Sequence, residues 1–222
     1  MKKIALCVPT LTQYDRLNLL IKSATASSNT VLPSAIYIVD NNPNDRYEPP
    51  AQCPCPIIVH KPKSNLGVAA SWNWFLNNVH PDHTYKNYIL ISNDDVKVYP
   101  ETLAHMLDAI NETGAPVVNG AGGEWAFFAQ DIHTLEAIGP YDEKFYPAYF
   151  EDNDYHYRLT LNGTDRAIAS HAIYEHITSA TLKAKNREET LAHHESFRKN
   201  HEYYVKKWGG TPGKETKKEP CL

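Results

Sequence analysis

The 222-residue sequence has little cysteine and lacks any long apolar run. Four cysteines in a chain of this length form no dense disulfide framework, which is typical of a reducing compartment. No stretch approaches the ~18 consecutive apolar residues of a membrane span. The apolar run at residues 4–8 is too short for a signal peptide and ends at Pro9. We therefore expect a soluble, cytoplasmic protein without a transmembrane segment.

An excess of basic residues is also missing. The chain has 22 Lys and Arg against 26 Asp and Glu, a net charge of −4, which argues against a nucleic-acid partner. Hydrophobic residues make up 42% and charged residues 22%, values that exclude disordered and fibrous classes. The 14 Tyr and 4 Trp predict a sizeable core.

Strand-like apolar runs alternate with helical patterns in the first half of the chain. Strands are predicted at residues 4–8, 35–39, 57–59 and 88–91, and amphipathic helices follow Thr12, Asn65 and Pro100. The segment from Thr12 to Asp15 resembles a capping box. This rhythm predicts an α/β fold with a single Rossmann-like, mostly parallel central sheet flanked by helices. Ligand loops are expected at the carboxyl ends of its strands.

The second half is less regular. Strands are predicted at residues 116–118 and 125–129, and helices at 132–138, 151–161 and 187–208. Residues 209–222 follow two glycines and are rich in Lys, Glu, Pro and Thr. We expect them to form a flexible tail, or a linker to a further domain.

A run of polar residues, Asn93-Asp94-Asp95, closes the strand predicted at 88–91. Adjacent carboxylates at the mouth of a sheet repel each other unless a cation joins them, and Mg²⁺ or Mn²⁺ prefers such oxygen ligands. Asn and Asp are also ordinary turn residues. The pattern alone therefore predicts either a metal site or a solvated turn.

A second acidic cluster, Glu151-Asp152-Asn153-Asp154, opens a predicted helix. Acidic residues in a first turn complement the helix dipole, which is a purely structural explanation. A carboxylate at the rim of a cleft is also suited to accept a proton from a hydroxyl nucleophile. Nearby tyrosines are typical either of core or of a surface that stacks on a sugar.

Two further features concern histidine and glycine. Of the 11 histidines, His171 and His176 lie close together near a strand end, where one of them is placed to complete a metal site. The glycine-rich segment 120–123 is no dinucleotide fingerprint, because Trp125 stands where a third glycine is needed. Gly122, Gly123 and Trp125 instead suit a loop that contacts an acceptor substrate.

The order and spacing of these clusters resemble the GT-A fold nucleotide-sugar glycosyltransferases, in particular family 2. The resemblance covers roughly residues 3–182. Its motifs are Val8-Pro9-Thr10 with Arg16, the strand end 38–42, the segment 65–73, Ser92-Asn93-Asp94-Asp95-Val96, the blocks 139–145 and 149–154, and His176-Ile177-Thr178-Ser179-Ala180-Thr181. The last segment is similar to rhamnosyltransferase-like members.

The resemblance implies a role for each motif. Residues 1–208 would form one GT-A domain, with a nucleotide-binding half at 1–95 and an acceptor half at 96–208. Asp95 and His176 would bind Mn²⁺ or Mg²⁺, Asp40 would accept a hydrogen bond from the base, and Asp152 would deprotonate the acceptor hydroxyl. Glu151 or Asp154 would position Asp152. The donor-binding residues would be Pro9, Thr10, Arg16, Asp40, Asn42, Asn65, Gly67, Asn93 and Asp94.

The implied reaction is metal-dependent transfer of a deoxyhexose such as rhamnose, or of a hexose, from a UDP- or dTDP-sugar to a glycan hydroxyl. Two departures stand against the family pattern: Asn93 offers a neutral oxygen where an Asp is usual, and Trp72 replaces an Arg of many members. These departures keep a non-catalytic carbohydrate- or partner-binding module open. A nucleotidyltransferase is the third alternative, although residues 9–13 lack the glycine-rich loop that it needs.

Overall fold

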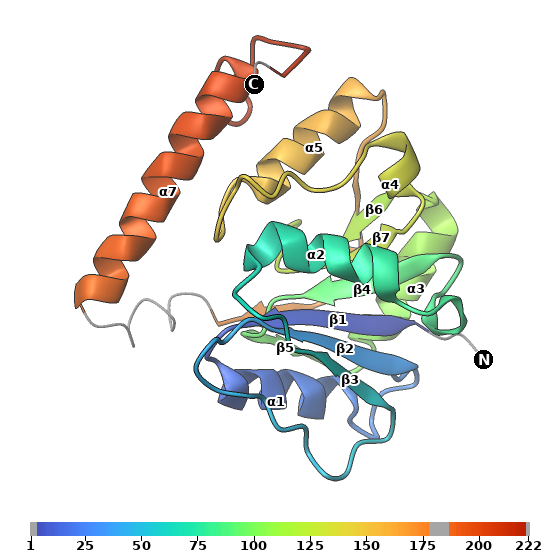
Figure 1. Ribbon diagram of the computed structural model, residues 1–222. Helices are drawn as coiled ribbons and strands as arrows, with labels where there is room; N and C mark the ends of the chain where they lie inside the picture. Colours follow the sequence, from blue (N-terminus) through green and yellow to red (C-terminus); the bar gives the residue numbers. More distant parts are fainter. Residues whose placement is uncertain (1–3, 178–186, 221–222) are drawn as a thin grey trace.

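The computed structural model describes residues 4–177 and 187–220 as an α/β structure (Figure 1). The first half contains β1 (Ala5–Thr10), α1 (Tyr14–Ala24), β2 (Ala35–Asp40), β3 (Ile57–His60), α2 (Gly67–Asn78), the 3₁₀ turn η1 (Pro81–His83), β4 (Tyr88–Ser92), β5 (Val96–Val98) and α3 (Thr102–Thr113). The second half contains β6 (Val117–Asn119), β7 (Phe127–Asp131), α4 (Thr134–Ala137), α5 (Glu151–Leu161), β8 (Ala167–Ile168), β9 (Tyr174–His176) and α7 (Arg187–Trp208).

Seven strands form the central sheet in the order β3-β2-β1-β4-β7-β6-β8. β1 pairs in parallel with both β2 and β4, whereas β7 runs antiparallel to β4 and β6. The chain thus leaves β1 toward β2 and β3 on one side and returns to β4 on the other. Such a change of direction opens a crevice at the carboxyl ends of the strands, where ligands of α/β sheets bind.

Helices cover both faces of the sheet. The apolar side chains of β1 point alternately to the two faces, so both faces must be buried. Leu6 and Val8 pack with α1 and α3 in one core cluster, and Ala5 and Cys7 pack with α2 in another. Figure 1 shows α1 and α2 on opposite sides of the sheet. The predicted α/β class with a mostly parallel sheet is confirmed.

The predicted element boundaries hold well for the long periodic segments. The helix predicted at 151–161 is α5 with the same bounds. The capping box at Thr12 is wrong, because α1 begins at Tyr14 and no side chain caps it. The short strands β5, β8 and β9 have two or three residues each, too few for a periodic signal. None of the described helices is long and apolar enough to cross a membrane.

The long helix α7 packs its C-terminal half against the segment that leads into α5. Phe145, Phe150, Tyr204 and Trp208 form a third core cluster there. The chain then turns back on α7: the amides of Thr216 and Lys217 donate to the Trp208 carbonyl, and Tyr157 Oη donates to the Lys217 carbonyl at 2.9 Å. Thr216 and Lys217 are therefore hydrogen-bonded to the end of α7 and to α5.

Candidate active site

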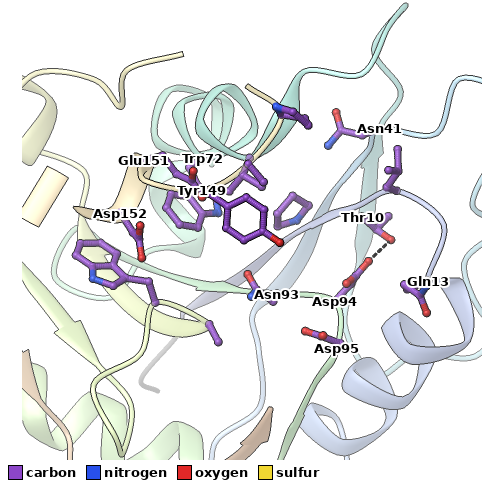
Figure 2. Close-up of a pocket in the computed structure, with 18 of the residues that line it drawn as sticks. Thr10, Gln13, Asn41, Trp72, Asn93, Asp94, Asp95, Tyr149, Glu151 and Asp152 are labelled. Carbon is purple, nitrogen blue, oxygen red and sulfur yellow. Dashed lines mark hydrogen bonds between the residues drawn. The ribbon is translucent and has the colours of Figure 1, made fainter. Parts of the chain in front are cut away.

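A cavity of about 1090 Å³ opens at the carboxyl ends of β1 and β4 (Figure 2). This lies at the upper end of the ~300–1,000 Å³ that is typical of ligand clefts. The predicted site residues that line the cavity are Pro9, Thr10, Asn65, Gly67, Asn93, Asp94, Asp95, Trp125, Glu151, Asp152 and His176. The predicted site residues outside its lining are Arg16, Asp40, Asn42, Gly122, Gly123 and Asp154.

The wall at the ends of β1 and β4 is built around Asp94. Thr10 Oγ1 donates to Asp94 Oδ2 at 2.7 Å, which joins the two strand ends directly (Figure 2). The pKa of Asp94 is raised to about 7. Burial of the carboxyl is the main cause and the charge of Asp95 adds to it, whereas the Thr10 hydrogen bond acts in the opposite direction. The negative charge of these neighbouring carboxyls would stabilise a cation, or a hydroxyl group that donates a hydrogen bond, at this wall.

Asp95 faces His176 across the mouth of the cavity. Their Oδ1 and Nε2 atoms are 3.2 Å apart, and His176 Nδ1 lies 3.0 Å from Glu124 Oε2. The hydrogen bond to Asp95 raises the pKa of His176, burial lowers it, and the hydrogen bond to Glu124 raises it further. β9 brings His176 to this place by pairing with β5, where His176 is opposite Val96.

These residues fit a divalent ion that is shared with a substrate. Among residues 4–177 and 187–220, no group of three or more His, Cys, Asp or Glu side chains is arranged as a metal cage. Mg²⁺ and related ions usually bind through one or two carboxylates together with substrate phosphates and waters. Asp95 and His176 supply one carboxylate and one imidazole at the cavity mouth, which meets that requirement.

The start of α2 forms the second wall. Asn41 Oδ1 accepts from the Leu66 amide at 2.8 Å, and Asn41 Nδ2 donates to Ser71 Oγ at 2.9 Å. Gly67 has a φ of +76°, and a Cβ atom there would lie 2.8 Å from the Pro147 carbonyl oxygen. Only glycine combines this conformation with so close an approach.

Asp40 does not face the cavity. Its side chain is fully buried, and its two oxygens accept from Tyr14 Oη, the amides of Asn42 and Tyr47, and Lys61 Nζ at 2.8–3.2 Å. Burial tends to raise the pKa of Asp40, but these hydrogen bonds, led by Lys61, hold it below the ordinary value. A direct contact with a base, as the resemblance implies, would need one of these donors to leave. Asp40 instead fixes the loop that follows β2.

Asn42 and Arg16 also belong to the surroundings of the cavity. The Asn42 carbonyl accepts from Lys61 Nζ, and Asn42 Oδ1 accepts from the Asn44 amide at 3.0 Å. Arg16 Nη1 lies 3.5 Å from the Ile177 carbonyl oxygen. Both side chains therefore contact the backbone of loops near the cavity and do not line it.

Glu151 and Asp152 form the wall opposite Asp94, at the first turn of α5 (Figure 2). Burial raises the pKa of both carboxyls, and the charge of Asp152 raises that of Glu151 further. The preceding residues Tyr149 and Phe150 have φ angles of 83° and 71°. Non-glycine residues with such angles store strain and tend to occur at functional sites.

Asp154 has a different environment from the one predicted for a catalytic residue. It is 0% exposed and binds Lys207 Nζ at 2.6 Å, Arg158 Nε at 2.9 Å and Trp208 Nε1 at 2.8 Å. Each of its oxygens is thus taken by a partner from α5 or α7. Asp154 holds α5 and α7 together and lies outside the cavity lining, so it contacts Asp152 only through the helix that they share.

The predicted acceptor loop is only partly at the cavity. Trp125 lines it, whereas Gly123 packs beside Ile168 and its carbonyl accepts from Arg166 Nη1. Glu124, between Gly123 and Trp125 in the sequence, lines the cavity and forms a hydrogen bond with His176.

The side of the cavity next to α7 was not predicted as part of the site. Tyr149, His193 and Ser196 close the cavity on the side of α7, where the Tyr149 and His193 rings stack at 5.0 Å. His193 and Ser196 lie on a polar helix without a sequence signal, and only packing reveals them. Tyr149 opens the block 149–154 that carries part of the family resemblance, although no binding role was predicted for it. The segment 178–181 that resembles rhamnosyltransferase-like members lies outside the described residues.

The mixed sheet and the cleft at its carboxyl edge define an α/β domain of the GT-A type. Residues 5–160 match the family described as Glycosyl transferase family 2, and the chain belongs to this family. No curated protein matches the sequence.

Solved structures share the fold at low sequence identity. S. aureus TarS 1-349 matches with a TM-score of 0.58 and 16% identity over 78% of this chain and 59% of that segment. Mannosyltransferase PcManGT from Pyrobaculum calidifontis, in complex with GDP-Man and Mn²⁺, matches with a TM-score of 0.59 and 11% identity over 80% of this chain and 58% of that protein. The same TarS segment with UDP-GlcNAc matches with a TM-score of 0.55, 16% identity and coverages of 91% and 66%. The chain thus spans about three fifths of the first two structures.

Proposed function

We propose that this protein transfers a sugar from a nucleoside diphosphate sugar to a hydroxyl group of a glycan, with Mn²⁺ or Mg²⁺ as cofactor. The proposal rests on one observation: Asp94 and Asp95 line one side of the cavity, and Glu151 and Asp152 line the opposite side. Family membership supports the reaction type. A UDP- or dTDP-sugar is the favoured donor, and the sugar is a hexose or a deoxyhexose such as rhamnose.

The donor diphosphate belongs at the wall formed by Thr10, Asn93 and Asp95. Asp95 and His176 would hold the metal ion, which as a Lewis acid would offset the charge that develops on the leaving diphosphate. Asn93 adds a neutral amide at the same edge, and Glu124 orients the His176 ring through Nδ1. Residues 1–95 would thereby bind the nucleotide, and residues 96–208 the acceptor.

Asp152 is the group that would accept the proton of the acceptor hydroxyl. The acceptor oxygen then forms a bond to the anomeric carbon while the bond from that carbon to the diphosphate breaks. The raised pKa of Asp152 brings its basicity nearer to neutral pH, where a general base is most effective. Such catalysis contributes about 10²–10⁴-fold.

Two variants test these roles. Asp95→Ala should abolish the Mn²⁺-dependent part of UDP binding, measured by calorimetry with and without Mn²⁺. Unchanged Mn²⁺ dependence would remove Asp95 from the metal site.

Asp152→Asn should bind the donor as the wild type does and lose at least about 10²-fold in transfer rate. The assay is release of UDP or dTDP from a panel of nucleotide sugars, with a glycan acceptor present. Full activity of this variant contradicts the base role. Glycan binding without turnover of any donor would instead favour the non-catalytic binding module.

A further inference from the structure

Trp72 has a buried hydrogen-bond donor without a partner. Its side chain is 2% exposed and lines the cavity, and Nε1 has no partner among the described residues. Edge contacts with Phe128 at 5.1 Å and Tyr141 at 4.9 Å between ring centroids hold the indole in place. Buried Trp N–H groups usually find a partner, so an N–H group left without one beside a cavity is suited to an acceptor atom of a ligand.

Glu151 has a second unpartnered polar atom in the same cavity. The residue is 6% exposed, and its Oε2 atom has no partner in the described part of the chain. Burial and the neighbouring Asp152 raise the pKa of Glu151 well above its ordinary value. This shift favours the neutral carboxyl, which presents an O–H donor as well as an acceptor oxygen.

The place of these two groups indicates which part of a ligand they meet. Figure 2 draws Trp72, Glu151 and Asp152 on one side of the cavity and Thr10, Asp94 and Asp95 on the other. The diphosphate belongs to the second side and the reacting acceptor hydroxyl to Asp152. The sugar that passes from one to the other lies between them, next to Trp72 and Glu151.

The chemistry of this side also fits a neutral, hydroxyl-rich ligand. An anionic phosphate next to Asp152 would be repelled, because the proposed metal ion lies on the other side of the cavity, whereas a sugar ring presents hydroxyls that accept from N–H and O–H donors. Trp125 stacks on Trp72 at 6.4 Å between ring centroids, is partly exposed and lines the cavity, so it adds apolar surface that suits the C–H face of a sugar. We propose that Trp72 Nε1 and the Glu151 carboxyl bind hydroxyl groups of the transferred sugar and so select the donor. This inference rests on the function proposed above.

The test compares binding of the nucleotide with and without its sugar. The probes are UDP, UDP-glucose, UDP-GlcNAc, GDP-mannose and dTDP-rhamnose, each measured by calorimetry with Mn²⁺. Trp72→Phe removes the N–H and keeps an aromatic ring. We expect it to leave the Kd of UDP unchanged and to weaken the preferred nucleotide sugar about 10-fold, the loss of one hydrogen bond. Trp74→Phe, the same change on α2 where the ring stacks on His60 outside the cavity, should alter neither.

Two substitutions of Glu151 separate its protonated from its charged form. Glu151→Gln keeps a neutral donor and should retain binding of the nucleotide sugar within about 3-fold, whereas Glu151→Met should lose about 10-fold or more. Comparable thermal unfolding midpoints of the variants would exclude misfolding as the cause.

Each outcome has a distinct meaning. Equal loss of UDP and of the nucleotide sugar in Trp72→Phe would place the indole at the nucleotide or diphosphate and overturn the inference. No loss in either variant overturns it as well. Failure of the wild type to bind any of the five probes would overturn the proposed function itself.

Discussion

The ammonium group of Lys207 joins α7 to two carboxylates that lie far away in the sequence. Its Nζ atom is 2.6 Å from Asp154 Oδ1 and 2.7 Å from Asp142 Oδ2. The Lys207 and Asp154 side chains are 6% and 0% exposed. Lys207→Met keeps most of the apolar stem and removes the charge, so it leaves both carboxylates without this partner.

The expected loss in the free energy of unfolding depends on the partners that the Asp154 and Asp142 carboxylates keep. Removing one partner of a buried ion pair costs about 3–5 kcal/mol. Asp154 keeps Arg158 Nε at 2.9 Å and Trp208 Nε1 at 2.8 Å, and Asp142 keeps the Tyr203 hydroxyl at 2.7 Å. We therefore expect the lower end of the range, a loss of about 3 kcal/mol in the free energy of unfolding.

Urea denaturation measures this loss. With a slope of about 1–3 kcal/mol per molar urea, the midpoint should fall by about 1–3 M. Lys206→Met is the matched control, because Lys206 is the exposed neighbour on the same helix and should change stability by less than about 0.5 kcal/mol. If Lys207→Met costs no more than Lys206→Met, the buried network does not stabilise the contact between α5 and α7.

Two further predictions concern acid stability and the start of α2. Burial tends to raise the pKa of Asp142, but Lys207 and Tyr203 hold it below the ordinary value of 3.8. Its ionised form therefore stabilises the fold above about pH 4, and this contribution disappears as the pH falls through the lowered pKa. Asp142→Asn should therefore weaken the dependence of the urea midpoint on pH in this range. An unchanged dependence would contradict the assignment. Gly67→Ala should lower the free energy of unfolding by about 1–3 kcal/mol more than Gly114→Ala does, measured by thermal unfolding. Both glycines have positive φ, but only an alanine at 67 would meet the Pro147 carbonyl. Equal losses would mean that this contact is unimportant.

Sequence reasoning was most successful where a pattern depends on neighbours along the chain. The strands predicted at 4–8 and 88–91 correspond to β1 and β4, and the helix predicted at 151–161 is α5, since apolar runs and polar breaks mark them. The structure brings the carboxyl ends of both strands and the start of α5 to one cavity. Parallel strands bring their carboxyl ends to a common edge whatever the loops contain. The class of fold and the position of the cleft were therefore predictable.

It was least successful where the role of a side chain depends on a distant partner. Asp40 is the last residue of β2, near a strand end as Asn93 is, but Lys61, Tyr14 and the Tyr47 amide converge on it and bury it. None of these donors stands at a spacing that marks it as a partner. The wall supplied by α7 is a similar case, because the contact of His193 with Tyr149 joins residues 44 positions apart.

The acidic block that opens α5 shows how helix geometry divides a motif. Residues two apart on an α-helix are rotated by about 200°, so Asp152 and Asp154 cannot point to the same place. Asp152 lines the cavity, and Asp154 turns toward Trp208 and Lys207 on α7. Arg158, four residues on, lies on the face of Asp154 and pairs with it, as the i, i+4 spacing allows. Of the two aspartates, then, one is available to a substrate while the other anchors the helix that carries it.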